Sequence, residues 1–174
     1  MSSFSQMLNF MMEDIRVTRT RPIKVWFNMP LRAVLAYRFY SHIYHAWSPV
    51  LAYILHNRAR CKYGVDIYPQ ARIGPGLCLV HLGAIVVGPG SVLGDRVTLQ
   101  SCVTLGQKDQ NSGEPTLGSH VYVGTGAKLL GNIHVGSGAV IGANAVVLHD
   151  VPDQHIAVGI PARCFPRQLE PAEL

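Results

Sequence analysis

Aliphatic side chains recur at every sixth position from residue 67 to residue 147 of this chain, with one interruption. The positions are Ile67, Ile73, Leu79, Ile85, Ser91, Val97 and Val103, then Leu117, Val123, Leu129, Val135, Ile141 and Val147, and all but Ser91 are aliphatic. A period of six fits neither the 3.6-residue turn of a helix nor the two-residue alternation of a simple strand. It predicts a solenoid in which each six-residue unit forms one flat side of a coil.

Small and turn-forming residues accompany this period. The position two residues before each aliphatic one is mostly small or apolar, and glycine, which turns a corner with little strain, follows the aliphatic residue at Gly74, Gly118, Gly124, Gly136 and Gly142. The pattern resembles the hexapeptide-repeat acyltransferases. The resemblance implies an all-β solenoid, a left-handed parallel β-helix with three hexads per coil. Its handedness is implied by the family and not by the period.

Residues 1–60 lack the six-residue period and are predicted to be helical. Apolar residues near helical spacing predict helices over Ser5–Arg19, ended by Pro22, and over Pro30–Trp47, and the pair Ser48-Pro49 predicts a third helix to Arg58. We expect these helices to cap the first coil or to pack on a neighbouring subunit, because an open solenoid end exposes its core. Peripheral association with a membrane surface stays open as an alternative.

The predicted β-helix domain covers residues 61–164. Its period is interrupted at residues 106–116, whose polar and glycine-containing sequence predicts an extruded loop. Loops on a rigid scaffold often carry specificity. Residues 165–174 contain proline and glutamate and are predicted to form a poorly ordered tail.

The composition fits one core and excludes several classes of function. The chain has 174 residues, 48% of them hydrophobic, which is enough for one sizeable core and a small appendage. Its net charge of +5 is mostly N-terminal, but no known nucleic-acid-binding motif accompanies it, so we expect no nucleic-acid partner. An anionic ligand or a membrane surface would explain the charge equally well.

The four cysteines show no metal-ligand spacing. Cys61, Cys78, Cys102 and Cys164 are far apart, without a C-x-x-C pair or spaced histidines, so we predict neither a metal site nor a disulfide framework. The chain also lacks a signal-peptide pattern and an apolar run of the ~18 residues that a membrane span requires. We therefore expect a cytoplasmic protein, with the inner face of the membrane as an alternative location.

Five ordered motifs are more specific than the period itself. They are Gly64-Val65-Asp66-Ile67-Tyr68-Pro69, Val80-His81-Leu82-Gly83, Ile85-Val86-Val87-Gly88, Gln100-Ser101-Cys102-Val103-Thr104-Leu105-Gly106 and Gly159-Ile160-Pro161-Ala162-Arg163. Together they are similar to the serine acetyltransferase branch of the hexapeptide superfamily, closely over residues 60–165 and weakly before them.

The resemblance implies a catalytic dyad of Asp66 and His81. The two residues are fifteen positions apart, nearly one circuit of a three-hexad coil, so their side chains can approach on adjacent rungs. A neutral imidazole can take the proton of an alcohol that attacks a thioester, and a carboxylate on the other ring nitrogen fixes the tautomer. Hydrogen bonding within their turns is the structural alternative for both residues. The other seven histidines, among them His56, are expected at the surface.

The resemblance also implies acetyl-CoA as co-substrate, lying along the solenoid in a groove between subunits of a homotrimer. The residues expected to bind it are Gly106, Thr125, Gly126, Gly142 and Ala143, with Arg163 or Lys128 available to its phosphates. Corner geometry alone would account for the glycines equally well.

The acceptor site departs from the family. Serine acetyltransferases carry an acidic residue before the catalytic histidine and Arg-His-Pro at the start of the second repeat block, and these bind the amino acid. This chain has Val80 and Gly113-Glu114-Pro115 there, which would leave the charged ends of serine unpaired. We therefore place Val80 and Glu114 at the substrate site and expect a different acceptor.

A likeness of the N-terminal region to acetyltransferases of exopolysaccharide loci, such as the colanic-acid type, favours a sugar. The main hypothesis is an O-acetyltransferase acting on a sugar hydroxyl of a saccharide or polysaccharide precursor. A serine O-acetyltransferase of cysteine biosynthesis and a non-catalytic solenoid binding protein stay open as alternatives. Docking onto cysteine synthase is not expected, because Leu174 replaces the isoleucine that this partner usually captures. A trimer is expected rather than a hexamer.

Overall fold

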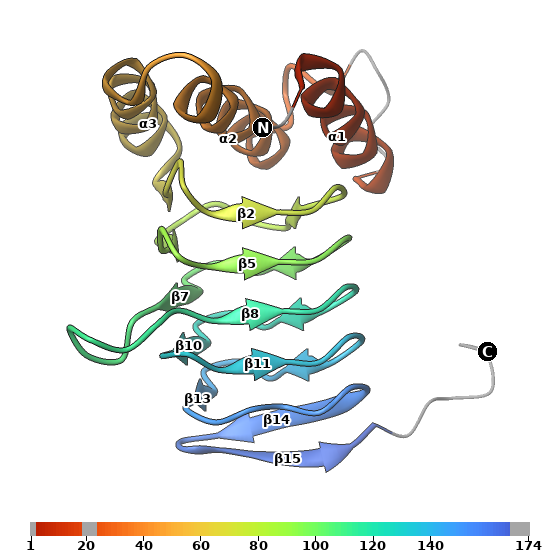
Figure 1. Ribbon diagram of the computed structural model, residues 1–174. Coiled ribbons are helices and arrows are strands. Elements are labelled where there is room, and N and C mark those ends of the chain that lie inside the picture. Colours follow the sequence, from red (N-terminus) through yellow and green to blue (C-terminus); the bar gives the residue numbers. More distant parts are fainter. Residues whose placement is uncertain (1–2, 19–23, 168–174) are drawn as a thin grey trace.

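Three helices cover one end of a parallel β-solenoid in the computed structural model (Figure 1), which describes residues 3–18 and 24–167. The helices are α1 (Phe4–Val17), α2 (Met29–Ala46) and α3 (Pro49–Tyr63). Ser48 caps α3 by accepting a hydrogen bond from Leu51 N, and a proline follows each cap of α2 and α3, as the sequence predicts. Arg19 and Pro22, at the predicted end of the first helix, lie outside the described residues.

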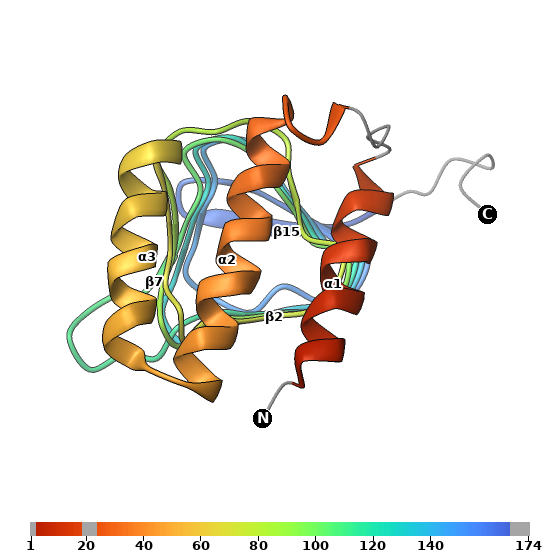
Figure 2. The same cartoon turned by 90° about the horizontal axis from the view of Figure 1, so that it is seen from above.

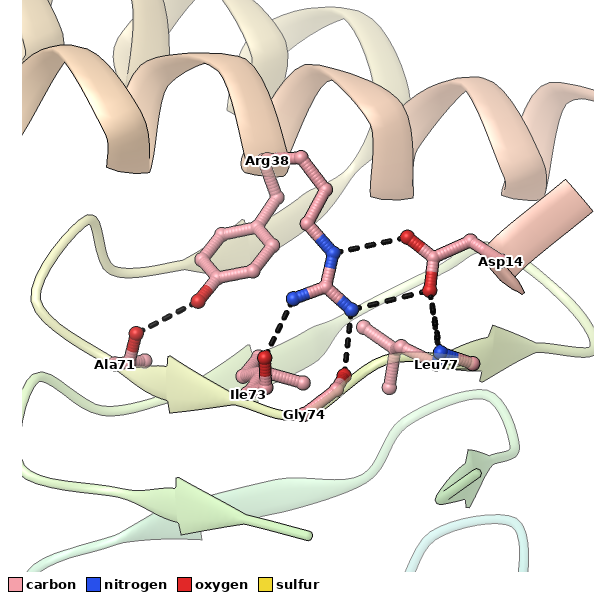
Figure 3. A network of polar contacts seen from close by, with 8 residues as sticks. Asp14, Arg38, Ala71, Ile73, Gly74 and Leu77 are labelled. Atoms are coloured by element: carbon pink, nitrogen blue, oxygen red, sulfur yellow. Dashed lines mark hydrogen bonds and ion pairs between the residues drawn. The ribbon is translucent and has the colours of Figure 1, made fainter. Parts of the chain in front are cut away.

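The helices lie side by side across the open end of the solenoid (Figure 2). Val34, Tyr37 and Tyr40 of α2 belong to the same buried core as the first coil. The buried carboxylate of Asp14 in α1 and the guanidinium of Arg38 in α2 form an ion pair that also binds the backbone of that coil (Figure 3). The helices therefore cap the end of the core.

Three flat sheets form the sides of the solenoid, and the strands within each stack as successive coils. Sheet A has the order β1-β4-β7-β10-β13, sheet B β11-β8-β5-β2 and sheet C β15-β14-β12-β9-β6-β3. The strands are β1 (Val65–Ile67), β2 (Arg72–Ile73), β3 (Cys78–Leu79), β4 (Ile85–Val87), β5 (Val92–Leu93), β6 (Thr98–Leu99), β7 (Thr104–Gly106), β8 (Thr116–Leu117), β9 (Tyr122–Val123), β10 (Lys128–Leu130), β11 (His134–Val135), β12 (Val140–Ile141), β13 (Val146–Val147), β14 (His155–Gly159) and β15 (Ala162–Pro166).

The coils differ in length, which corrects the repeat register read from the sequence. Sheet A pairs Ile67 with Val87, Val87 with Leu105, Leu105 with Leu129 and Leu129 with Val147. The differences between these numbers give successive coils of 20, 18, 24 and 18 residues. Counting in steps of six from Ile67 therefore reaches, after the first coil, a core-facing position that is not the register partner of Ile67. Both positions face the core, so the sequence pattern concealed the shift.

The two extra residues of the first coil lie in the turn that contains His81. Leu79 pairs with Leu99 and Val87 with Leu105, so eight residues separate Leu79 from Val87, whereas six separate Leu99 from Leu105. The third coil is six residues longer than its neighbours because the polar segment between β7 and β8 leaves the solenoid. Figure 1 shows it as a loop beside β7.

The last coil ends in an antiparallel pair, β14 with β15. β15 continues to Pro166, inside the segment predicted as a tail, and residues 168–174 of that segment, with Leu174, lie outside the described residues. Within residues 3–18 and 24–167, none of the helices has the length and apolar character needed to cross a membrane.

Candidate functional site

Asp66 lies in the middle of β1 with its side chain on the outer face of sheet A, between the buried Val65 and Ile67. Its carboxylate contacts two side chains of α3. His56 Nε2 lies 2.7 Å from Oδ1, and Arg60 Nη1 donates to Oδ2 at 3.4 Å. The Asp66 side chain keeps 21% of its surface exposed. It is therefore an oriented carboxylate at the edge of the solenoid rather than a residue that only organises its turn.

His81 lies in the long turn between β3 and β4 and is exposed. Leu82 beside it packs against the core, and Gly83 and Ala84 close the turn with φ of 119° and 47°. Asp66 is the register partner of Val86, which follows this turn by a few residues. No hydrogen bond or ion pair joins Asp66 to His81 within the described residues.

His56 was missed as a site residue, because all the histidines other than His81 were expected at the surface. It is 3% exposed and forms the shortest contact of Asp66. The available signal was the spacing of Ala52 and His56, four residues apart on α3 and both buried on the face toward β1. A histidine on the buried face of a helix needs a polar partner, and Asp66 is the carboxylate that follows the end of α3.

Most of the residues predicted to bind acetyl-CoA follow one edge of the solenoid. We name the row of turns from sheet C to sheet A the C–A ridge; it comprises residues 80–84, 100–103, 124–127 and 142–145. Backbone hydrogen bonds stack these turns: Cys102 N donates to Gly83 O, Gly126 N to Ser101 O and Asn144 N to Thr125 O, at 2.8–2.9 Å. The ridge therefore aligns His81 with Thr125, Gly126, Gly142 and Ala143.

Two cations flank this row. Val158 of β14 lies on the rung beyond Gly142, and Arg163 of β15 pairs with Val158. Lys128 Nζ in β10 donates to Cys102 O of the ridge at 2.6 Å. Five strand spacings separate the rung of Val80 from that of Arg163, which is about 24 Å at ~4.8 Å per rung. An elongated ligand with its reactive end at His81 and a phosphate end near Arg163 fits this length.

Packing, rather than a ligand, accounts for Gly142. A Cβ atom at Gly142 would lie 2.6 Å from Val158 Cγ1 of the next coil. Gly126 has φ of 77°, and a Cβ there would lie against the amide oxygen of Asn144. Both glycines are required by the turns themselves, so the exposed Thr125 and Ala143 are the more informative positions.

Gly106 and Glu114 lie away from the C–A ridge. Gly106 ends β7 where the polar loop leaves sheet A, and the Glu114 carboxylate accepts hydrogen bonds from Gly90 N at 3.0 Å and Ser91 Oγ at 2.9 Å. These contacts explain why Ser91 breaks the aliphatic period. They also mean that Glu114 has hydrogen-bond partners within its own subunit. Val80, by contrast, is on the ridge beside His81 and is 37% exposed.

The apolar surroundings of His56 affect a neighbouring tyrosine. Tyr40 packs 5.5 Å from the His56 ring, and its hydroxyl donates to Ile67 O at 2.6 Å. Burial first, and then the nearby Tyr37 and Asp66, raise the pKa of Tyr40 far above its ordinary value. Tyr40 is therefore a neutral donor at every pH at which the protein would act.

A cavity of about 470 Å³ lies elsewhere, between α1, α2 and strands β2 and β5, and none of the predicted site residues lines it. Across residues 3–18 and 24–167 there is also no cluster of three or more histidine, cysteine or acidic side chains that could hold a metal ion.

Comparison with known proteins identifies close relatives. The family model of bacterial transferase hexapeptides (six repeats) matches residues 114–149. Serine acetyltransferase from Salmonella typhimurium is 42% identical over 159 residues, covering 86% of this chain and 58% of the relative, and the Escherichia coli K12 protein is 40% identical with the same coverage. This chain thus spans a little under three fifths of the length of these relatives.

Solved structures show the same relationship. A truncated serine acetyltransferase apoenzyme aligns with a TM-score of 0.86 and 35% identity, covering 93% of this chain and 71% of the other. A Neisseria gonorrhoeae serine acetyltransferase in complex with serine aligns with a TM-score of 0.86 and 34% identity, covering 94% of this chain and 70% of the other. A serine acetyltransferase in complex with CoA aligns with a TM-score of 0.85 and 35% identity, covering 93% of this chain and 71% of the other. The likeness confirms the left-handed parallel β-helix.

These relatives overturn the prediction of a sugar acceptor, which is wrong. That prediction rested partly on Glu114 standing in the segment that binds the amino acid in the family, but the Glu114 carboxylate is hydrogen-bonded to the turn of the preceding coil. The identities above 30%, over at least 70% of the solved chains, establish the relationship. The chain belongs to the hexapeptide-repeat transferase family, as a homologue of the serine acetyltransferases.

Proposed function

We propose that this protein is a serine O-acetyltransferase, which transfers the acetyl group of acetyl-CoA to the hydroxyl of L-serine. The observation that supports this most directly is the likeness to serine acetyltransferases across the coils that carry Asp66 and His81, including structures with serine and with CoA. It replaces the hypothesis of a sugar acceptor.

In this proposal His81 is the general base. Its imidazole is exposed at the ridge, where an acceptor hydroxyl can reach it, and takes the hydroxyl proton as the oxygen attacks the thioester carbon of acetyl-CoA. Asp66 accepts the other ring N–H, which holds the tautomer and stabilises the imidazolium that forms. In this proposal the contact between the two side chains forms in the substrate complex, since catalytic hydrogen bonds are often longer without substrate.

The C–A ridge supplies the binding site for acetyl-CoA. Thr125 and Ala143 are exposed along it, so a pantetheine arm can lie against their backbone and small side chains. Arg163 provides a cation for the phosphates at the far end, and Lys128 a second one closer to the middle. Gly106 lies at the other end of the sheet A strands, so its contact with the ligand requires the adjoining loop or a neighbouring subunit.

We also propose a homotrimer in the cytoplasm, with the site completed between subunits. Val80, Tyr122 and Val158, on sheet C or at its edge, are each 37–40% exposed. Exposed apolar side chains on this side of the solenoid are suited to contact with a second copy of the chain. Light scattering on the purified protein measures the molecular mass of the assembly, and the expected mass is three times that of one chain.

The test is a thiol-release assay with acetyl-CoA and either L-serine or a panel of oligosaccharides, with the product identified by mass spectrometry. We expect CoA release and O-acetylserine with L-serine only. His81→Ala should lower kcat by about 100- to 10,000-fold, the usual contribution of a positioned base, while the affinity for CoA is retained. His120→Ala, which changes an exposed histidine on the turn between sheets B and C, is the matched control. Sugar acetylation without serine acetylation, or near-normal turnover by His81→Ala, would refute the proposal.

A further inference from the structure

The histidine that contacts Asp66 in the structure is His56 of the helical cap. The Asp66 carboxylate uses Oδ1 for His56 Nε2 at 2.7 Å, and its only other side-chain contact in the described residues is the longer one from Arg60 to Oδ2 at 3.4 Å. The His56 side chain is 4% exposed and that of Arg60 is 50% exposed. The buried contact is therefore the one that water and salt disturb least.

The ring of His56 is held in one orientation. Its centroid lies 5.3 Å from that of Tyr68, 5.5 Å from that of Tyr40 and 6.2 Å from that of Tyr53. His56 Nδ1 is buried without a hydrogen-bond partner in the described part of the chain. Only Nε2 makes a polar contact, so the tautomer that bonds an ionised Asp66 carries its proton there.

The backbone fixes the place from which His56 approaches. α3 ends at Tyr63, and its C-cap Gly64 adopts the left-handed conformation with φ of 64° and donates from its N–H to Arg60 O. β1 begins at the next residue, Val65. Only this short turn separates the helix that carries His56 from the strand that carries Asp66, so the two side chains have little freedom to separate.

We propose that His56 is a positioning residue for the acetyl transfer: its Nε2–H holds Oδ1 of Asp66 and thereby turns the remaining carboxylate lone pairs toward His81. This rests on the proposed function, in which His81 is the base. A carboxylate offers about four acceptor positions, and one oxygen held by a buried ring leaves the other for the imidazole of His81. The helical cap thereby takes part in orienting the base as well as in closing the core.

Substitution should separate orientation from packing. His56→Leu removes the donor and keeps an apolar side chain against the tyrosines, so we expect kcat for serine acetylation to fall about tenfold, part of the contribution of a positioned base. His56→Gln keeps an N–H donor and should recover most of that loss. The KM for acetyl-CoA should change less than twofold in both. Asn57→Leu, on the exposed side of α3, is the matched control and should behave as the wild type.

A double-mutant cycle with Asp66→Asn tests whether His56 acts through Asp66. If it does, His56→Leu causes no further loss of kcat in the Asp66→Asn background, because residues that act as one unit are not additive. An equal loss in both backgrounds, or an unchanged kcat in His56→Leu, would overturn the proposal. If His56→Leu does not fold, His56→Met, which also lacks a hydrogen-bond donor, takes its place in the same cycle.

A measurement that does not depend on turnover separates the positioning role of His56 from the proposed serine acetyltransferase activity. The ring protons of His81 can be followed by NMR across pH in the wild type, His56→Leu and Asp66→Asn. Positioning by His56 predicts that both variants shift the His81 titration midpoint in the same direction, and an unaltered His81 titration in His56→Leu would contradict it. A wild-type protein that acetylates no serine refutes the proposed function, whereas the titration still tests the orientation of His81 by His56 through Asp66.

Discussion

Removal of the Arg38 guanidinium should detach the helical cap from the solenoid. Asp14 is fully buried and accepts four hydrogen bonds: Arg38 Nε at 2.9 Å, Arg38 Nη2 at 3.0 Å, and the N–H groups of Gly76 and Leu77 at 2.9 Å each. Arg38 also donates to the carbonyls of Ile73 and Gly74 at 2.5 and 2.6 Å (Figure 3). One ion pair therefore joins α1, α2 and the first coil.

Arg38→Met keeps much of the aliphatic volume and removes the charge. It leaves the Asp14 carboxylate buried with only two amide donors, and breaking one partner of a buried ion pair costs about 3–5 kcal/mol. In a chain of this length each kcal/mol corresponds to roughly 2–4 °C, so we expect the melting temperature to fall by about 6–20 °C. Replacing Asp14 by Leu as well should cost less than the sum of the two single changes, because no unpaired charge remains.

Urea unfolding followed by circular dichroism gives the free energy, and hydrogen exchange read by mass spectrometry locates the loss. We expect the amides of α1 and α2 to exchange faster while those of the last coils are unchanged, since local opening needs less free energy than global unfolding. Arg58→Met, at an exposed position of α3 where the Arg58 side chain makes no hydrogen bond or ion pair with the described residues, is the control and should remain within about 0.5 kcal/mol of the wild type. A loss below about 1 kcal/mol for Arg38→Met would refute the role of this pair.

Two further predictions concern the ridge and the thiols. Val80→Asp places a carboxylate beside the base, so it should lower the KM for L-serine several-fold. The KM for N-acetylserine, which lacks the ammonium group, should stay the same. An equal change in KM for both acceptors would contradict pairing of the new carboxylate with the ammonium group. Burial, and then the field of Asp14, raise the pKa of the Cys78 thiol, so less thiolate is present at pH 8. Iodoacetamide should therefore alkylate Cys78 more slowly than the exposed Cys61, Cys102 and Cys164, and peptide mass spectrometry that found Cys78 modified first would show this to be wrong.

The solenoid was predictable because its signal is local. The hexads repeat an inward aliphatic residue, which a corner glycine follows at five positions, so a solenoid follows from the residues themselves, whereas three hexads per coil was implied by the family resemblance. The caps of α2 and α3 were equally local, since Ser48-Pro49 specifies a helix start without reference to distant residues. The coil of 20 residues around His81 was not visible in the period, because the shifted positions, such as Ile85 and Val97, are also buried.

The sequence by itself determined the fold class, the family and the positions of Asp66 and His81 on the outside of the first coil. The tertiary structure alone decided the partners of its charged groups: Asp14 with Arg38, Glu114 with Ser91, and His56 with Asp66. Periodicity reports which side of an element faces the core. It does not report which two polar side chains meet once three helices have docked on a coil, because that depends on the distances between elements far apart in the chain.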